Sequence, residues 1–240
     1  MSISKSLLFE HEYKINDNIR IRIPTLREIL EFGESNYYGL VTNLTAMPID
    51  MLVELDDLGI DFTEINDYEL FCLLFPLLKI QDTSLIFGEL DLTKFEPAIN
   101  EQNGMFVMLD RENDIMIDQA IQSQIADTLR KIHHLEKNIR KPANEEAKRY
   151  LLERARRKRK RNKNKPDSSQ LESLIVAMVN TEEFKYNFES VKDLTIYQFN
   201  ESVRQIIKKV DFNNKMIGVY AGTVDAKTLS QDDLNWLIHK

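Results

Sequence analysis

The sequence is poor in cysteine, glycine, proline and tryptophan, with one, seven, six and one of these residues among 240. The lone Cys72 cannot form an internal disulfide, and its apolar neighbours predict a reduced, buried thiol in a cytosolic protein. The glycines are scattered, so they form no glycine-rich loop that could cradle a phosphate. These shortages argue against disulfide scaffolds and nucleotide-dependent enzymes.

Long hydrophobic segments are also missing. The longest apolar run, Leu70 to Ile80, has about half the length that a bilayer-crossing helix needs, and it contains Pro76. The N-terminus reaches Glu10 too early for a signal-peptide apolar region. We therefore expect neither membrane insertion nor export.

No group of residues predicts catalysis, a cofactor or a metal site. The four histidines have no partners at metal-ligand spacing, and the adjacent His133 and His134 are expected at the surface or its boundary. The acidic residues from Asp110 to Asp118 imitate a calcium loop, but isoleucine stands where its glycine and its bidentate glutamate should be. A solvated turn between two strands is the better interpretation, and the sequence predicts a protein that is not an enzyme.

Charge is distributed unevenly along the chain. The net charge is −7, yet residues 138–165 hold 13 Lys and Arg against 3 acidic residues, which gives +10. Residues 1–137 have 11 basic and 25 acidic residues, or −14, and residues 166–240 have 8 and 11, or −3. Three segments follow from this pattern and from the periodicity: an acidic α+β body (1–137), a basic helical arm or linker (138–167), and a C-terminal helical module packing on the body (168–240).

The fold class is mainly α with a small β component. Alternation around Asn16 and Asp17 predicts a hairpin over 13–23, and Thr25 with Glu28 has the spacing of a capping box. Further predictions are short helices up to residue 80, small strands between 83 and 118, a helix over 119–137, a projecting basic helix over 143–163, a helix opened by Ser169, a long packed helix over 195–220, and a short final helix within 225–240.

The basic arm is the first candidate partner-binding site. Beyond Leu152 its helix is predicted to have no face to bury, so that it projects into solvent. Nine cations follow without an acid: Arg154, Arg156, Arg157, Lys158, Arg159, Lys160, Arg161, Lys163 and Lys165. They suit an acidic partner or sequence-nonspecific contact with nucleic acid, and the acidic remainder of the chain disfavours nucleic acid. The alternative is a solvated arm without a partner.

Several phrases carry a family resemblance: IRIPTLREILEFGESNYYGLV from Ile21, LDDLGID from Leu55, LTIYQFNESVRQIIKK from Leu194, GVYAGTVDAK from Gly218 and DLNWL from Asp233. Almost from end to end, the chain resembles a protein type from the structural-gene cluster of tailed bacteriophages of Gram-positive bacteria, regarded as tail-assembly chaperones. The resemblance implies a non-enzymatic helical protein that binds the tape-measure protein and helps tail-tube subunits to polymerise around it. It places the protein in the cytoplasm of the infected host or, alternatively, in the virion.

A chaperone of this kind needs exposed or exposable apolar surface. The candidate apolar partner-binding residues are Tyr197, Phe199, Tyr220 and Trp236, for which ordinary core is the alternative. Two other functions stay open: a virion component such as a connector or baseplate adaptor, and a nucleic-acid-binding phage protein that acts through the basic arm.

Overall fold

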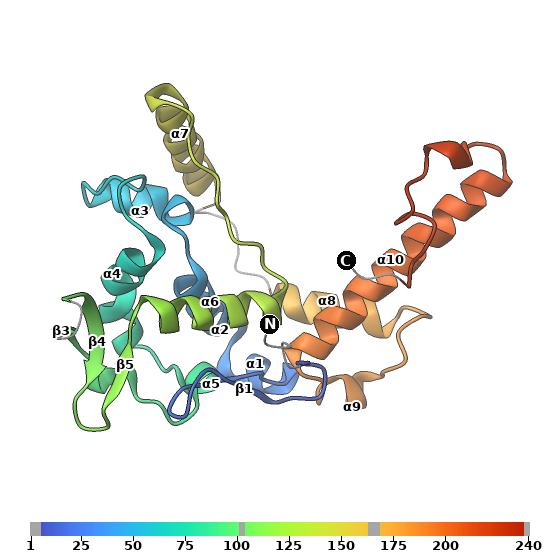
Figure 1. Ribbon diagram of the computed structural model, residues 1–240. Coiled ribbons are helices and arrows are strands. Elements are labelled where there is room, and N and C mark those ends of the chain that lie inside the picture. Colours follow the sequence, from blue (N-terminus) through green and yellow to red (C-terminus); the bar gives the residue numbers. More distant parts are fainter. Residues whose placement is uncertain (1–5, 101–103, 163–168, 238–240) are drawn as a thin grey trace.

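The structure is a computed structural model that describes residues 6–100, 104–162 and 169–237 (Figure 1). It is mainly helical with two small antiparallel sheets, which confirms the predicted fold class. Short 3-10 turns lie at Pro48–Met51, Leu92–Lys94 and Ala226–Thr228. The helices are α1 (Leu26–Phe32), α2 (Glu34–Thr45), α3 (Leu52–Asp57), α4 (Asp67–Lys79), α5 (Ser84–Phe87), α6 (Gln119–His133), α7 (Glu145–Asn162), α8 (Gln170–Val179), α9 (Phe188–Val191) and α10 (Ile196–Tyr220).

The chain begins with the predicted hairpin. Strands β1 (Glu12–Lys14) and β2 (Arg20–Arg22) pair antiparallel, with Tyr13 opposite Ile21. The Asn16 side chain closes the turn by accepting hydrogen bonds from the backbone N–H groups of Asn18 and Ile19. Thr25 then forms the predicted capping box with Glu28 and starts α1.

A second sheet contains three strands in sequence order. These are β3 (Glu96–Ile99), β4 (Phe106–Asp110) and β5 (Ile115–Ile117), all antiparallel to their neighbours. The Tyr68 hydroxyl donates to the Ile117 carbonyl at 2.8 Å and so ties this sheet to α4. The prediction of strands is confirmed at β4 and β5. It is wrong for Leu85–Phe87, which form α5, because a short run of buried apolar residues has no alternation that separates strand from helix.

Two apolar clusters support the body. The larger one contains buried residues from Leu7 to Phe199, contributed by both sheets and by α1, α2, α4, α5, α6, α8, α9 and the first turn of α10. The smaller one surrounds α3 and includes Leu55, Phe62 and Leu74, with Leu152 and Ala155 of α7 packed against it. The basic helix is therefore anchored on the smaller cluster, whereas α10 is anchored in the larger one.

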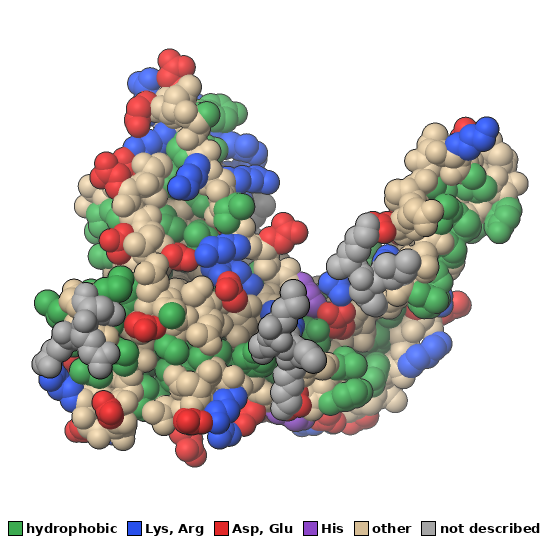
Figure 2. Space-filling view, viewed as in Figure 1, with side chains coloured by type: hydrophobic (Ala, Val, Ile, Leu, Met, Phe, Trp, Pro, Cys, Tyr) green, Lys and Arg blue, Asp and Glu red, His purple; other side chains and the backbone are tan. Residues whose placement is uncertain are grey.

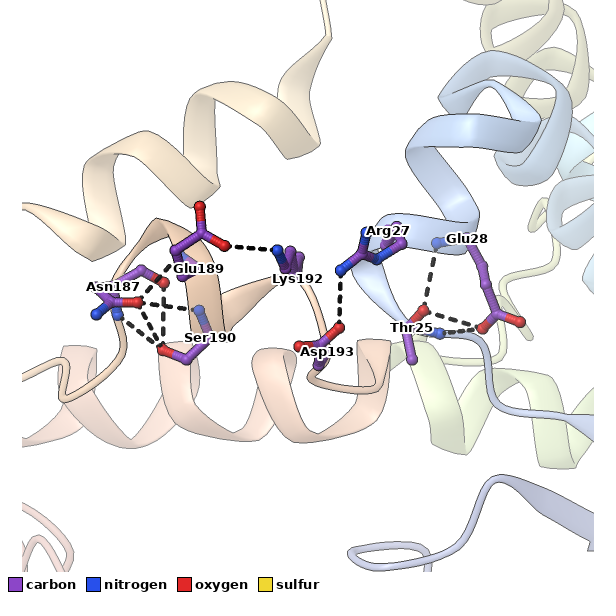
Figure 3. A network of polar contacts seen from close by, with 8 residues as sticks. All are labelled: Thr25, Arg27, Glu28, Asn187, Glu189, Ser190, Lys192 and Asp193. Carbon is purple, nitrogen blue, oxygen red and sulfur yellow. Dashed lines mark hydrogen bonds and ion pairs between the residues drawn. The ribbon is translucent and has the colours of Figure 1, made fainter.

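Polar contacts join the base of α10 to the start of α1. Thr25 and Thr195 form an isolated antiparallel bridge, and each caps its own helix through a capping box. The Leu26 N–H donates to the Leu194 carbonyl at 3.0 Å, and Arg27 pairs with Asp193 at 3.2 Å (Figure 3). These contacts fix the direction in which α10 leaves the body.

The C-terminal segment differs from its prediction. In place of a final helix, the described residues after Asp225 have only the 3-10 turn and then run back beside α10. Lys215 pairs with Asp233 at 2.6 Å, and the Gln205 side-chain amide donates to the Trp236 carbonyl at 2.9 Å. These contacts hold the returning segment against α10.

Candidate functional site

The histidines and acidic residues considered as possible metal ligands do not come together in one site. Among the described residues, no group of three or more His, Cys, Asp or Glu side chains could hold a metal ion. Asp110 accepts hydrogen bonds from the backbone N–H groups of Glu112 and Asn113 and from the Asn113 side chain. The Asn113 bond lowers the pKa of Asp110, and the acidic segment forms the turn between β4 and β5.

No helix in the described ranges is both long and apolar enough to cross a membrane.

The prediction for the histidines is wrong for His133, which is buried. Its Nε2 lies 2.9 Å from the Tyr37 hydroxyl, where the last turn of α6 packs against α2. His133 follows Leu129 by four residues and therefore shares the apolar face of α6. Burial, assisted by neighbouring His134, lowers the pKa of His133 to about 4.

This buried histidine predicts a loss of stability in mild acid. His133 stays neutral in the folded protein down to about pH 4, whereas in the unfolded chain it binds a proton near its ordinary pKa of 6.5. Stability is fully present above pH 6.5 and falls as the pH decreases toward 4, by about 3 kcal/mol from this group. Urea unfolding between pH 7 and 4 should give a flatter profile for His133→Asn than for wild type, while the exposed control His11→Asn should keep the wild-type slope. Parallel profiles for wild type and His133→Asn would contradict this assignment.

Helix α7 presents an inner face to α3. Arg156 pairs with Asp56 at 2.5 Å and with Asp57 at 2.7 Å, and Arg159 pairs with Asp57 at 3.2 Å. Lys148 forms a further ion pair with Asp61 and lowers the pKa of that carboxyl to about 2. Together with Leu152 and Ala155, these residues define the inner face of α7. The sequence predicted no face to bury beyond Leu152, and no described residue of α7 is fully buried, but Ala155 packs partly on the smaller cluster and Arg156 and Arg159 join this part of the helix to α3.

The other basic candidates lie on a different side of α7. They are exposed and form the outer cationic face, which we define as Arg154, Arg157, Lys158, Lys160 and Arg161. Figure 2 shows basic side chains gathered over this projecting helix. Two predicted residues, Lys163 and Lys165, lie outside the described residues.

Helix α10 is buried at its base and exposed at its far end. Ile196 and Phe199 are fully buried, and Val203 and Ile206 pack partly on the larger cluster. Farther along, Ile207, Val210, Ile217 and Tyr220 are 61%, 37%, 65% and 85% exposed. These four residues form the distal stripe. The prediction of a long helix is confirmed, but its packing on the body is confined to its first turns.

Val210, Ile217 and Tyr220 of the distal stripe continue a regular spacing that begins in the core, and Ile207 lies beside this row. Steps of three and four residues alternate from Ile196 through Phe199, Val203, Ile206, Val210, Asn213, Ile217 and Tyr220. This 3-4 spacing is typical of helices that pack lengthwise against another helix. The body covers the first half of the row, and Figure 1 shows the second half projecting away from the body.

The returning C-terminal segment covers another face of α10. Lys209 lies over the Trp236 ring at 5.9 Å, and the Val224 side chain approaches so closely that a Cβ at Gly218 would lie 2.8 Å from it. Phe212, Met216 and Val219 on this side are partly buried. Hence the chain itself protects one apolar side of the projecting helix and leaves the distal stripe open.

The four apolar candidates from the sequence have different environments. Phe199 is in the core, so it is not available for binding in the folded protein. Tyr197 is half-buried beside His134, with ring centroids 5.5 Å apart, and Trp236 is half-buried on the returning segment. Only Tyr220 is fully accessible. Ile207, Val210 and Ile217 were missed as site residues, although the 3-4 spacing of Val210 and Ile217 is a signal that could have found them.

A known protein family matches the C-terminal part of the chain. The family model described as YomV second domain matches residues 160–239, which contain α8, α9 and α10. This family is phage-derived and of the Bacillus prophage type, and the match supports a bacteriophage origin. Neither the curated proteins nor the solved structures give a match.

Proposed function

We propose that the protein is a non-enzymatic assembly factor of a tailed bacteriophage, which binds a tail component through the distal stripe of α10. The component is the tape-measure protein or the tail-tube subunits, and binding takes place in the cytoplasm of the infected host. The protein would hold the apolar surface of its partner until the tail is assembled.

The observation that carries this proposal is the exposure of the distal stripe. Ile217 and Tyr220 are each more than half exposed on one side of a helix that has left the body, and Ile207 is 61% exposed at the edge of this side. Apolar surface of this kind on a soluble protein marks a contact with another molecule, and an amphipathic helix suits a helical partner. The adjacent side chains of Asn213 and Asn214 are uncharged, so no ionised group has to lose its hydration there.

Two further observations support a phage tail partner. The matched phage-derived family covers the part of the chain that contains the distal stripe. The sequence also resembles tail-assembly chaperones in segments on both sides of α7. Direct binding of nucleic acid is less well supported, since Arg156 and Arg159 are occupied by carboxylates of α3.

Co-expression tests the proposal. The chain should keep the tape-measure protein encoded in the same phage soluble and should co-purify with it. An unbound or insoluble tape-measure protein, together with no binding to the tail-tube protein, would contradict the proposal. Mass spectrometry of purified particles separates an assembly factor from a building block. We expect the protein to be absent from particles, and its stoichiometric presence would instead indicate a connector or baseplate component.

A further inference from the structure

The outer cationic face of α7 has a charge pattern that the fold itself does not use. Within the described chain, Arg157 has a carboxylate partner, Glu153 at 3.0 Å, but Arg154, Lys158, Lys160 and Arg161 have none within 4.0 Å. Arg154 lies three and four residues from Arg157 and Lys158, and Arg161 lies four and three residues from the same two, at spacings where like charges destabilise a helix. The inner face must therefore hold α7 in its helical form against this repulsion.

The inner face of α7 binds carboxylate groups. Arg156 and Arg159, three residues apart, contact carboxylates of α3 that belong to Glu54, Asp56 and Asp57. The guanidinium group suits this arrangement because it carries five N–H donors, and each of the two arginines contacts two carboxylates through one terminal nitrogen. An acidic helix is thus already bound on one side of α7.

The outer face also presents arginines at spacings of three and four residues, and no other described helix pairs with them. Arg154, Arg157 and Arg161 are separated by three and four residues, so they lie along one line of the helix. Carboxylates at the same spacings on a facing helix would lie at the same intervals along its axis. Tyr150, which is 64% exposed, stands one turn before this line and offers a ring for packing.

We propose that the outer cationic face of α7 is a docking surface for an acidic helix of a partner protein. Charge complementarity selects this occupant. Binding relieves the repulsion among the arginines and lysines and replaces it with the kind of ion pairs that α3 makes on the other side. The proposal concerns a surface separate from the distal stripe of α10 and does not depend on it.

The surroundings of α7 favour an acidic helix over nucleic acid. Glu145 and Glu146 open α7, Glu153 lies beside Arg157, and α3 adds Glu54, Asp56 and Asp57 on the inner side. A duplex carries closely spaced phosphates along its whole length, so its backbone would pass these carboxylates on either side of the cations. A short acidic helix can match the cationic patch and end where the patch ends. A second copy of the chain is also less suited, because its α3 is already covered by its own α7.

Fluorescence anisotropy with the full chain tests this surface. The probes are a labelled helical peptide of alanine and glutamate, with glutamates three, four and seven residues apart, and a labelled mixed-sequence DNA duplex. The test variant carries Arg154→Gln, Lys158→Gln and Arg161→Gln, and the control variant carries Arg111→Gln, Lys185→Gln and Lys227→Gln. Both lose three positive charges at exposed positions, and glutamine retains high helix propensity.

We expect wild type and control to bind the peptide more tightly than the duplex, with an affinity that decreases as salt is added. The test variant should lose roughly tenfold in peptide affinity, because three exposed ion pairs are removed. Circular dichroism should show equal helicity for the two variants. Tighter binding of the duplex, equal peptide affinity of both variants, or salt-sensitive dimerisation through the same residues would each overturn the proposal. Binding of the tape-measure protein by the test variant should remain, which keeps this result separate from the proposed function.

Discussion

Replacing Phe199 by alanine is expected to destabilise the protein by about 3–5 kcal/mol, the usual cost of removing a large aromatic side chain from a core. Phe199 is fully buried at the base of α10 and packs edge-to-face against Phe184, with ring centroids 6.0 Å apart. Its loss removes packing that joins α10 to the larger apolar cluster. Urea denaturation should therefore show a lower midpoint for Phe199→Ala.

The matched control is Phe9→Ala, because the Phe9 side chain is 82% exposed. This variant should change the stability by less than about 0.5 kcal/mol, as is usual for surface substitutions. Equal effects of Phe9→Ala and Phe199→Ala would contradict the anchoring of α10 in the core. A loss below about 1 kcal/mol for Phe199→Ala would contradict it as well.

The second large effect is expected on binding and not on folding. A variant with Ile207→Gln, Ile217→Gln and Tyr220→Gln should fold as well as wild type, because all three side chains are mostly exposed and glutamine is a good helix former. Its affinity for the tail partner should fall by about 100-fold or more, since loss of even two buried apolar anchors costs several kcal/mol at an interface. Isothermal titration with the purified partner, or quantitative co-purification, measures this loss.

The control for the distal stripe replaces apolar residues of similar exposure elsewhere. Phe9, Ile80 and Ile139 are 82%, 81% and 75% exposed, and they can all be changed to glutamine in one variant. We expect that variant to bind the tail partner like wild type. Equal loss in both triple variants would show that general surface hydrophobicity, and not the distal stripe, determines binding.

Local sequence signals predicted the starts of several helices. Thr25 forms the predicted capping box with Glu28, and the side chain of the predicted first residue Ser169 caps α8 by accepting a hydrogen bond from the Glu172 N–H. The residues of such a cap are three positions apart, so the information lies within one turn. The hairpin around Asn16 was predictable for the same reason.

Contacts between distant segments were not predictable in this way. The pairing of Arg156 with Asp56 joins residues 100 positions apart, and the charge pattern of α7 contains no information on where α3 lies. The burial of His133 likewise depends on how α6 packs on α2. For α10, the 3-4 spacing predicted an apolar face over its full length, but only the fold shows that the body covers its first turns and leaves Ile217 exposed.

Hydrogen–deuterium exchange on the purified complex with its tail partner is the most direct test of the central claim. Binding through the distal stripe should slow exchange over residues 203–220, and the triple variant at Ile207, Ile217 and Tyr220 should abolish this protection. If binding instead protects only the body around α2 and α6 and leaves α10 exchanging as in the free protein, the distal stripe is not the binding surface and the account is wrong.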